Sequence, residues 1–188
     1  SVIDGNKKVC IIGGGVGCAI AYPTAKAFHE AGADVTTIVG FRNKDLVILE
    51  EEFKKVSDAY YLMSDDGSVG EKGLVTNKLE DLITGGEKFD EVVAIGPIVM
   101  MKFVSLTTKK YNIPTTVSMN PVMIDGTGMC GGCRLKVGDE IKFACVDGPD
   151  FDGHLVDFDQ AMARNTAYKS FEAHKRDEAC HLLNKEVE

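Results

Sequence analysis

Short apolar segments alternate with amphipathic segments between residues 8 and 119. The apolar segments have the length of buried strands, and the segments between them have the length and periodicity of crossover helices. We predict strands at residues 8–12, 34–39, 59–63, 91–95 and 115–119, and helices at about residues 17–31, 44–56, 74–83 and 98–111. Because such crossovers are right-handed and cover both faces of a sheet, the sequence predicts an α/β fold with a five-stranded, doubly wound parallel sheet.

The alternation stops at Asn120, where glycine, cysteine and short polar turns take over. Residues 134–137 and 140–145 flank the pair Gly138-Asp139, which suits the tight turn of a small hairpin. The residues from 157 onward are charged and periodic, which predicts a tail of one or two helices. We therefore divide the chain into a sheet domain (1–119), a cysteine-containing segment (120–156) and a helical tail (157–188).

The composition argues against two classes of partner. A net charge of -8 would repel a phosphate backbone, and no basic stripe with interleaved aromatic residues is present, so we expect no nucleic acid partner. No apolar run approaches the roughly 20 residues needed to cross a bilayer, and the polar start SVIDGNKK does not resemble a signal peptide. We expect a cytoplasmic protein without membrane contact.

A glycine loop, Gly13-Gly14-Gly15-Val16-Gly17, lies between the first predicted strand and the first predicted helix. Its backbone amides can approach a pyrophosphate at the positive end of that helix, which favours a dinucleotide site. The pattern departs from the usual fingerprint, because Cys18 replaces the third glycine and no acidic residue ends the second strand. Tight packing of strand against helix is the alternative explanation for the loop.

Two further loops follow strands at the same predicted edge of the sheet. Asp65 and Asp66 follow the third strand, where their carboxylates would repel a ribose 2'-phosphate and accept hydrogen bonds from free ribose hydroxyls. This favours NAD(H) over NADP(H), although a solvated turn explains either carboxylate equally well. Gly96-Pro97 follows the fourth strand and reads either as a simple helix start or as the floor of a nicotinamide pocket.

The cysteine segment has the spacing of an iron-sulfur motif with one exchange. Asp125, Cys130 and Cys133 follow the pattern of a ligand, four residues, a ligand, two residues and a ligand, and Cys145 is a more distant fourth candidate. The aspartate takes the place of the first cysteine of plant-type 2Fe-2S motifs. The glycines between these residues let the backbone fold closely around a cluster and direct amides at its sulfides.

A structural zinc site with three thiolates and one carboxylate is the alternative to the cluster. Zinc sites more often use two close pairs of ligands, so the spacing favours iron and sulfur. Clustered thiols in a chain without export signals also indicate metal binding more than disulfides. We interpret the remaining cysteines as packing residues: Cys10, Cys18 and Cys180.

Six segments together resemble a known family: GGGVG, GFRNKDLVILEEEF, SDDGSVGEKGLVT, AIGPIVMMKFV, DGTGMCGGCR and FACVDGPDFDGH. They resemble the small (alpha) subunits of NADH-dependent reduced ferredoxin:NADP oxidoreductases, in the ferredoxin-NADP reductase superfamily. The electron-transfer subunits of dihydroorotate dehydrogenase B and the sulfide dehydrogenase subunits are related families. The aspartate-for-cysteine exchange at Asp125 is the most specific part of the resemblance, which extends to about Gln160.

The resemblance implies a ferredoxin reductase-like nucleotide domain followed by a 2Fe-2S segment. Family members carry an N-terminal β-barrel that binds FAD, and this sequence lacks the barrel and its flavin motif. NADH would bind at Gly13–Gly17, Asp65, Asp66 and Gly96-Pro97. Hydride would pass to a flavin held mostly by the barrel, and electrons would continue through a cluster at Asp125, Cys130, Cys133 and Cys145. Ala19-Ile20-Ala21, where relatives often have a proline, departs from the family pattern.

We therefore predict an NAD(H)-linked oxidoreductase subunit that transfers electrons, with no catalytic side chain assigned and no activity expected of this chain alone. The resemblance implies a larger subunit with flavin and iron-sulfur cofactors as the partner, and ferredoxin as a second one. An electron-transfer subunit for dihydroorotate or sulfide oxidation is the alternative within the class. A zinc-stabilised nucleotide-binding module without a redox role is the alternative from another class.

Overall fold

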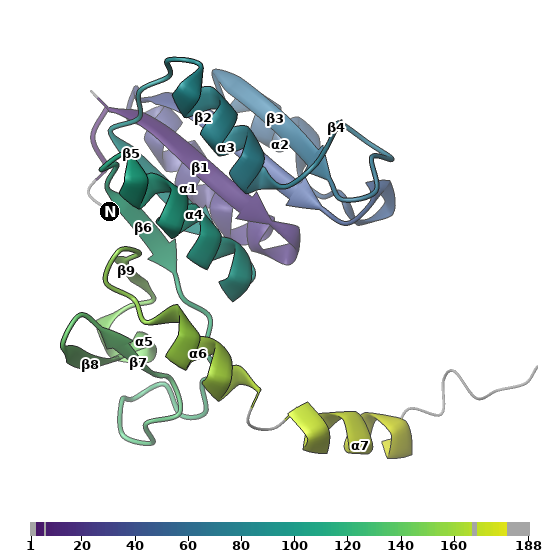
Figure 1. Cartoon of the computed structure of the whole chain (residues 1–188), viewed down its shortest axis with the longest axis vertical. Coiled ribbons are helices and arrows are strands. Elements are labelled where there is room, and N and C mark those ends of the chain that lie inside the picture. Colours follow the sequence, from purple (N-terminus) through teal and green to yellow (C-terminus); the bar gives the residue numbers. More distant parts are fainter. Residues whose placement is uncertain (1–2, 6, 167–168, 180–188) are drawn as a thin grey trace, which may run out of the picture.

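The computed structural model describes residues 3–5, 7–166 and 169–179, and most of them form one mixed sheet and the helices around it (Figure 1). The strand order is β4-β3-β2-β1-β5-β6-β9. All neighbouring strands are parallel except β6 and β9, which are antiparallel. The strands are β1 (Lys8–Gly14), β2 (Asp34–Phe41), β3 (Ala59–Ser64), β4 (Glu71–Lys72), β5 (Glu91–Ile95), β6 (Thr115–Ser118) and β9 (Asp150–Asp152).

Helices cover both faces of the sheet, as expected for a doubly wound fold. In Figure 1, α3 and α4 lie in front of the sheet and α1 and α2 lie behind it. These helices are α1 (Cys18–Glu30), α2 (Glu50–Lys55), α3 (Val75–Thr84) and α4 (Ile98–Lys110), with short 3-10 turns η1 (Gly15–Gly17) and η2 (Lys44–Leu46). The predicted α/β class is therefore confirmed.

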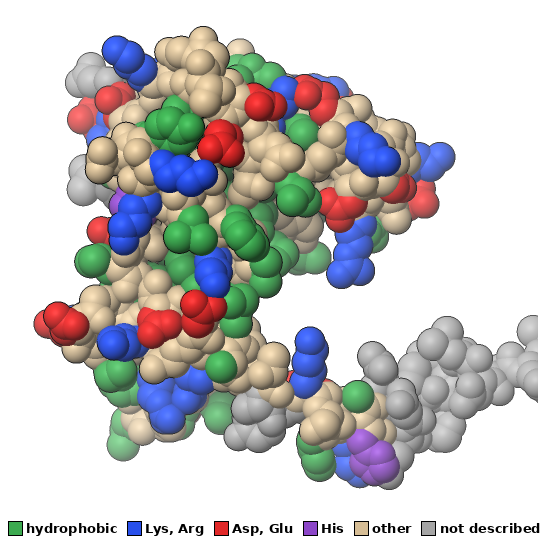
Figure 2. All heavy atoms as spheres, in the orientation of Figure 1, with side chains coloured by type: hydrophobic (Ala, Val, Ile, Leu, Met, Phe, Trp, Pro, Cys, Tyr) green, Lys and Arg blue, Asp and Glu red, His purple; other side chains and the backbone are tan. Residues whose placement is uncertain are grey.

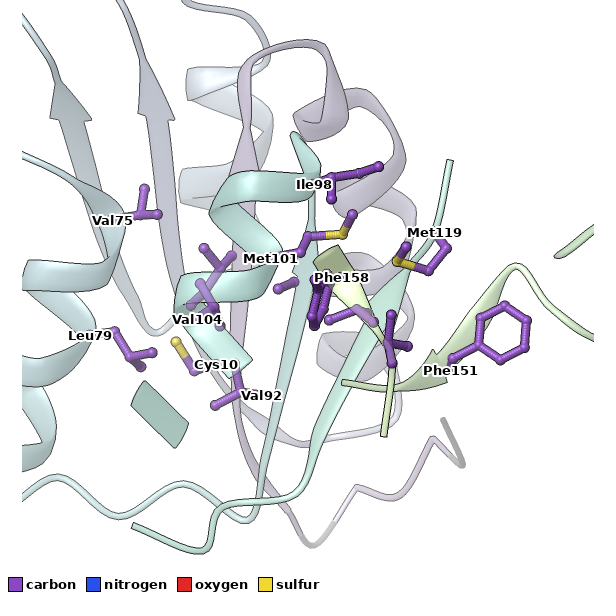
Figure 3. Close-up of a cluster of buried hydrophobic side chains, with 14 of the residues drawn as sticks. Cys10, Val75, Leu79, Val92, Ile98, Met101, Val104, Met119, Phe151 and Phe158 are labelled. Carbon is purple, nitrogen blue, oxygen red and sulfur yellow. The ribbon is translucent and has the colours of Figure 1, made fainter. Parts of the chain in front are cut away.

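Strand residues alternate between two hydrophobic clusters, one on each face. In β1, Cys10 and Ile12 point to the α3 and α4 side, whereas Val9 and Ile11 point to the α1 and α2 side. Burying both faces explains why the strands are continuous apolar runs in the sequence. We call the cluster on the α3 and α4 side the front cluster. Figure 3 shows that it also includes Phe151 and Phe158. The core on this side therefore continues past residue 120.

The sheet has more strands than the five that we predicted. All five are present and parallel, but β4 and β9 add one short strand at each edge of the sheet. Two and three residues are too few to show an alternating pattern, and of β9 only Phe151 is buried. The count of five was wrong because edge strands this short have no periodicity to detect.

The prediction of one continuous helix over residues 44–56 was wrong. The segment forms η2 and α2, with Val47 in an extended conformation and Leu49 in the left-handed region at φ 58°. A left-handed residue cannot continue a right-handed helix, so the segment breaks there. The apolar periodicity of the segment did not reveal this break.

Apart from β9, most of the residues from 121 to 165 form a smaller lobe below the sheet (Figure 1). Its hairpin consists of β7 (Arg134–Val137) and β8 (Glu140–Phe143), which is shorter than predicted because Ala144 and Cys145 begin helix α5 (Ala144–Asp147). Two helices follow, α6 (Phe158–Asn165) and α7 (Lys169–Ala179), as the tail prediction allowed. The rest of the predicted tail, residues 180–188 with Cys180, lies outside the described residues.

The strand order reverses between β1 and β5, because the chain moves outward through β2 to β4 on one side and through β5 and β6 on the other. In doubly wound sheets ligands bind at the carboxyl ends of the strands at such a reversal. The fold therefore places the glycine loop after β1 and Gly96-Pro97 after β5 at the expected ligand position. Among the described residues, no helix has both the length and the apolar character needed to cross a membrane.

Candidate functional site

A cavity of about 1080 Å³ opens at the carboxyl ends of β1 and β5. Its walls include residues from the loops that follow six strands of the sheet, β1 to β6. Of the residues predicted to bind a nucleotide, seven line this cavity: Gly14, Gly15, Val16, Gly17, Asp65, Gly96 and Pro97. Loops far apart in the sequence therefore meet at one pocket, as the sheet topology predicted.

The glycine loop is required by close packing as well as by access to the pocket. A Cβ on Gly14 would lie 2.5 Å from Met100 Sδ, and one on Gly17 would lie 2.6 Å from the Ile95 carbonyl oxygen. Gly15 differs, because it has φ +54° and nothing lies within 4 Å of its Cβ position. The packing alternative therefore explains Gly14 and Gly17, whereas Gly15 faces open space in the pocket.

The start of helix α1 offers backbone amides to this space. Neither η1 nor α1 has a side-chain cap, and no acidic residue lies in the first turn of either. The first amides of a helix have no partner within the helix and carry partial positive charge. Negative groups of a ligand, such as a pyrophosphate, are therefore favoured beside Gly15, Val16 and Gly17.

Two charged side chains, Arg42 and Asp65, line the pocket within the described part of the chain. No hydrogen bond or ion pair in the described residues engages either side chain. Asp66 does not line the pocket, because its Oδ1 accepts from the Ser68 amide at 2.9 Å within the turn. Hydrogen bonds from Ser68 lower the pKa of Asp66, and the Ser68 side chain contributes more than the Ser68 amide. The solvated-turn alternative therefore describes Asp66, whereas Asp65 lines the pocket and stays a predicted nucleotide contact.

The sequence did not assign Arg42 to the site. Arg42 follows β2, whose end lies at the same edge of the sheet as the glycine loop. That position was the available signal, because the ends of all parallel strands converge there. Gly13, in contrast, does not reach the pocket: it pairs with Ile95 in the sheet, and a Cβ on it would lie 2.7 Å from Cys18 Sγ.

The far wall of the pocket comes from residues of the cysteine-containing segment on either side of the predicted ligands. Asn120, Pro121 and Met123 line it from the start of the segment, and Pro149 lines it from beyond Cys145. Val99 and Phe103 of α4 are exposed apolar side chains on the same wall. Figure 2 shows hydrophobic side chains facing the hollow between the sheet and the smaller lobe. The pocket and the cysteine segment are therefore directly adjacent.

Residues 125–133 form the cysteine loop, which carries three of the four predicted ligands. Asp125 accepts hydrogen bonds from the amides of Thr127 at 2.9 Å and Cys130 at 3.1 Å. The Thr127 amide, followed by the contacts from Cys130, lowers the pKa of the Asp125 carboxyl. Gly126, Gly128 and Gly131 all have positive φ, a conformation that glycine adopts without steric cost. The carboxylate and Cys130 are thus brought to one side of a tightly turned loop.

The other two predicted ligands contact each other. Cys133 is buried and Cys145 is partly buried, and the two thiols are hydrogen-bonded. This hydrogen bond, with a contribution from burial, raises the pKa of Cys145. Backbone amides also approach the sulfurs: Gly128 donates to Cys145, and Gly132 donates to Cys130 at 3.4 Å. Amides directed at sulfur are what an iron-sulfur site needs.

The donor atoms of the four predicted ligands suit an iron-sulfur group, and the ligands lie together in two pairs. Three soft sulfur donors and one carboxylate are present, and amides approach two of the sulfurs. Within the described residues, however, no three His, Cys, Asp or Glu side chains converge closely enough to hold a metal ion. The structure therefore brings Asp125 to Cys130 and Cys133 to Cys145, but it does not join the two pairs in one ligand shell.

Cys10 and Cys18, the two described cysteines outside the segment, lie in the core. Cys10 and Cys18 are fully buried beneath the glycine loop. Burial raises the pKa of Cys18 to about 12 and also raises the pKa of Cys10, so both thiols stay neutral. Their interpretation as packing residues is confirmed.

Comparison with known proteins identifies the cysteine-containing segment first. Residues 120–157 match the family described as the iron-sulfur cluster binding domain of dihydroorotate dehydrogenase B. Over 172 residues the chain is 49% identical to a Thermotoga maritima homologue of the dihydroorotate dehydrogenase B (NAD(+)) electron transfer subunit, covering 92% of this chain and 60% of that protein. A Clostridium beijerinckii protein, described only as an uncharacterized protein in the adh 3' region, is 52% identical over 88% of this chain and 56% of its own.

One solved structure is similar over almost the whole chain. It comes from work on flavin-based electron bifurcation by NADH-dependent reduced ferredoxin-NADP oxidoreductase. It has a TM-score of 0.86 and 46% identity, and the match covers 95% of this chain and 64% of the other. The chain is a homologue of these electron-transfer proteins. The resemblance predicted from the sequence is therefore confirmed, including the ferredoxin reductase-like fold.

This homologue corresponds to part of its relatives. It spans 56% and 60% of the two curated relatives described above. The relatives named for a function are oxidoreductase subunits, which agrees with the predicted oxidoreductase class. In this chain, the region that matches the iron-sulfur family begins at the residues that form the far wall of the pocket.

Proposed function

We propose that the chain is the NAD(H)-binding and 2Fe-2S-binding part of an electron-transfer subunit. One observation carries this proposal: residues of the cysteine-containing segment on either side of the predicted ligands line the cavity at the carboxyl ends of β1 and β5, namely Asn120, Pro121, Met123 and Pro149. A redox group in the cysteine loop would then lie beside a bound nucleotide. Such proximity favours electron transfer between the two sites through a flavin.

In the proposed complex, the pocket holds NADH by three kinds of contact. The amides at Gly15–Gly17 bind the pyrophosphate, and Asp65 accepts a hydrogen bond from a ribose hydroxyl. Arg42 compensates negative charge, while Pro97 and Met100 form the floor below the nicotinamide. We place FAD mostly on a domain outside this chain. A bound flavin takes up hydride and releases its electrons singly.

The proposed cluster ligands are Asp125, Cys130, Cys133 and Cys145. The two contacting pairs and the amides near the sulfurs support this assignment. A structural zinc ion is the alternative that the same donor set allows. We propose a larger flavin and iron-sulfur subunit as the electron partner, with ferredoxin as a second partner, in the cytoplasm, where thiols stay reduced. Among the alternatives, an electron-transfer subunit that takes electrons from a dihydroorotate-oxidising partner is favoured by the names of the relatives.

Metal analysis and spectroscopy of anaerobically prepared protein test this function. We expect about two irons and two sulfides per chain, because a 2Fe-2S cluster contains two of each. Reduction with dithionite should give an EPR signal and bleach the visible absorption. A colourless protein with stoichiometric zinc would refute the redox proposal and support the zinc alternative.

Exchange of the aspartate tests the ligand set. The Asp125→Cys variant should keep its cluster but shift the midpoint potential, because thiolate replaces carboxylate as a ligand. Asp139→Cys in the turn of the β7–β8 hairpin is the matched control and should leave the potential unchanged. If Asp125→Cys leaves both spectrum and potential unchanged, Asp125 is not a ligand.

A further inference from the structure

Arg164 reaches from helix α6 into the cysteine loop. Its Nη2 donates a hydrogen bond to the Gly132 carbonyl oxygen at 3.2 Å, across 32 residues of sequence. Gly132 lies between Cys130 and Cys133, two of the proposed ligands. Arg164 is only partly exposed. A guanidinium charge is therefore held directly against the loop in which we place the cluster.

The helix that carries Arg164 is held at several points. Asp157 caps its start by accepting from the Gln160 amide at 2.9 Å, and Phe158 and Ala161 are buried in the front cluster. Asp159 forms an ion pair of 2.6 Å with Lys102 on α4. Helix α6 also packs against β7, which follows Cys133. The position of Arg164 is thus set by the core and by the helix that forms a wall of the nucleotide pocket.

We propose that Arg164 is a positioning residue that raises the reduction potential of the iron-sulfur cluster; this inference rests on the proposed function. Reduction adds one negative charge to the cluster, so a nearby fixed cation stabilises the reduced form more than the oxidised form. Because Arg164 is partly withdrawn from solvent, its charge is less screened than that of an exposed side chain.

The hydrogen bond to Gly132 acts on the same cluster through the backbone. The carbonyl of Gly132 and the amide of Cys133 belong to one planar peptide group, so fixing the carbonyl fixes the direction of the amide. The amide of Gly132 itself already donates to Cys130 Sγ. Hydrogen bonds from amides to cluster sulfurs are one of the determinants of the potential. Arg164 thus contributes through both charge and loop geometry.

A second cation near the loop provides the matched control. Arg134 is exposed, and its Nη1 lies 3.7 Å from the Cβ position of Gly131. No hydrogen bond in the described residues joins its side chain to the loop. Arg134→Gln therefore removes a nearby charge without removing a loop contact, whereas Arg164→Gln removes both. Arg164→Lys keeps the charge, but its shorter side chain loses the contact with Gly132.

The experiment is an EPR-monitored redox titration of the anaerobic chain and its variants, with iron content measured for each. We expect a lower midpoint potential for Arg164→Gln, a smaller decrease for Arg164→Lys and the least change for Arg134→Gln. A fully loaded Arg164→Gln with the wild-type potential would overturn the inference, as would an equal decrease in Arg134→Gln. If Arg164→Gln does not retain iron, Arg164→Lys tests the positioning of the loop through the Gly132 hydrogen bond: a lowered potential supports it and a wild-type potential refutes it.

The same measurements separate this inference from the function on which it rests. Wild-type protein that binds no iron-sulfur cluster contradicts the proposed function. Wild-type protein with a cluster whose potential is insensitive to Arg164 contradicts only the positioning role.

Discussion

Gly15 and Gly138 have the same backbone conformation in different surroundings. Their φ values are +54° and +59°, and nothing lies within 4 Å of the Cβ position of either. Gly15 faces the pocket, whereas Gly138 is in the turn between β7 and β8. The pair therefore separates the cost of a left-handed backbone from the cost of obstructing a ligand.

Alanine at each position should lower the free energy of unfolding by about 1 kcal/mol, because a left-handed conformation is strained for a residue with a Cβ. Only Gly15→Ala should also weaken NADH binding, by about tenfold or more, since its methyl group enters the proposed pyrophosphate space. Denaturant unfolding and NADH titration measure the two effects. Equal NADH affinity in both variants would place the pyrophosphate elsewhere.

Asp65 and Asp66 are adjacent in sequence but differ in their surroundings. Asp65 lines the pocket, and Asp66 is bonded within its own turn. We expect Asp65→Asn to raise NADPH affinity relative to NADH by about tenfold, because a carboxylate that repels the 2'-phosphate is lost. Asp66→Asn is the control and should not change the ratio. Competitive binding of the two nucleotides measures it, and a wild-type ratio in Asp65→Asn would contradict the assigned role.

At the scale of elements, helix α6 depends on the residue that caps its start. The Asp157 side chain accepts from the Gln160 amide at the start of the helix. We expect Asp157→Ala to lower the free energy of unfolding by about 1 kcal/mol, since a helix cap is lost, and Asp157→Ser to recover most of it. Thermal or urea unfolding measures the change. Equal losses in both variants would show that the cap itself is not the source of the effect.

Strands with a continuous apolar run were predictable, and the two- and three-residue edge strands were not. The strands from β1 to β6, apart from β4, are buried on both faces and so appear as apolar runs. The edge strands β4 and β9 depend on pairing with other segments. Local periodicity contains no information about such contacts, so the sequence could not place them.

At the scale of the whole molecule, one hydrophobic cluster joins the sheet to the smaller lobe. Leu135 of β7 belongs to it and is 2% exposed, together with Val117 of β6. The predicted division at residues 119 and 120 therefore passes through a shared core. The division itself stays a prediction. Because the two parts share a hydrophobic cluster, we expect them to unfold together.

Leu135→Ala should lower the stability of the whole chain by about 2–5 kcal/mol, because a buried leucine is removed from a packed core. Ile141→Ala on the facing strand β8 is the control: Ile141 is 53% exposed, and its loss should cost about 0.5 kcal/mol or less. Urea unfolding followed by circular dichroism should show one shifted transition for Leu135→Ala. An unshifted sheet transition with separate loss of the lobe would mean independent units.

By itself the sequence determined the α/β class, the edge of the sheet at which the pocket lies and which residues are candidate metal ligands. These depend on local patterns: runs of buried residues, glycines at a strand end and the spacing of thiols. The tertiary structure decided which neighbours share a site. It placed Asp65 and Arg42 in the pocket and Asp66 outside it, and it brought Arg164 to Gly132. Contacts between distant segments follow from how the elements pack, which no local pattern encodes.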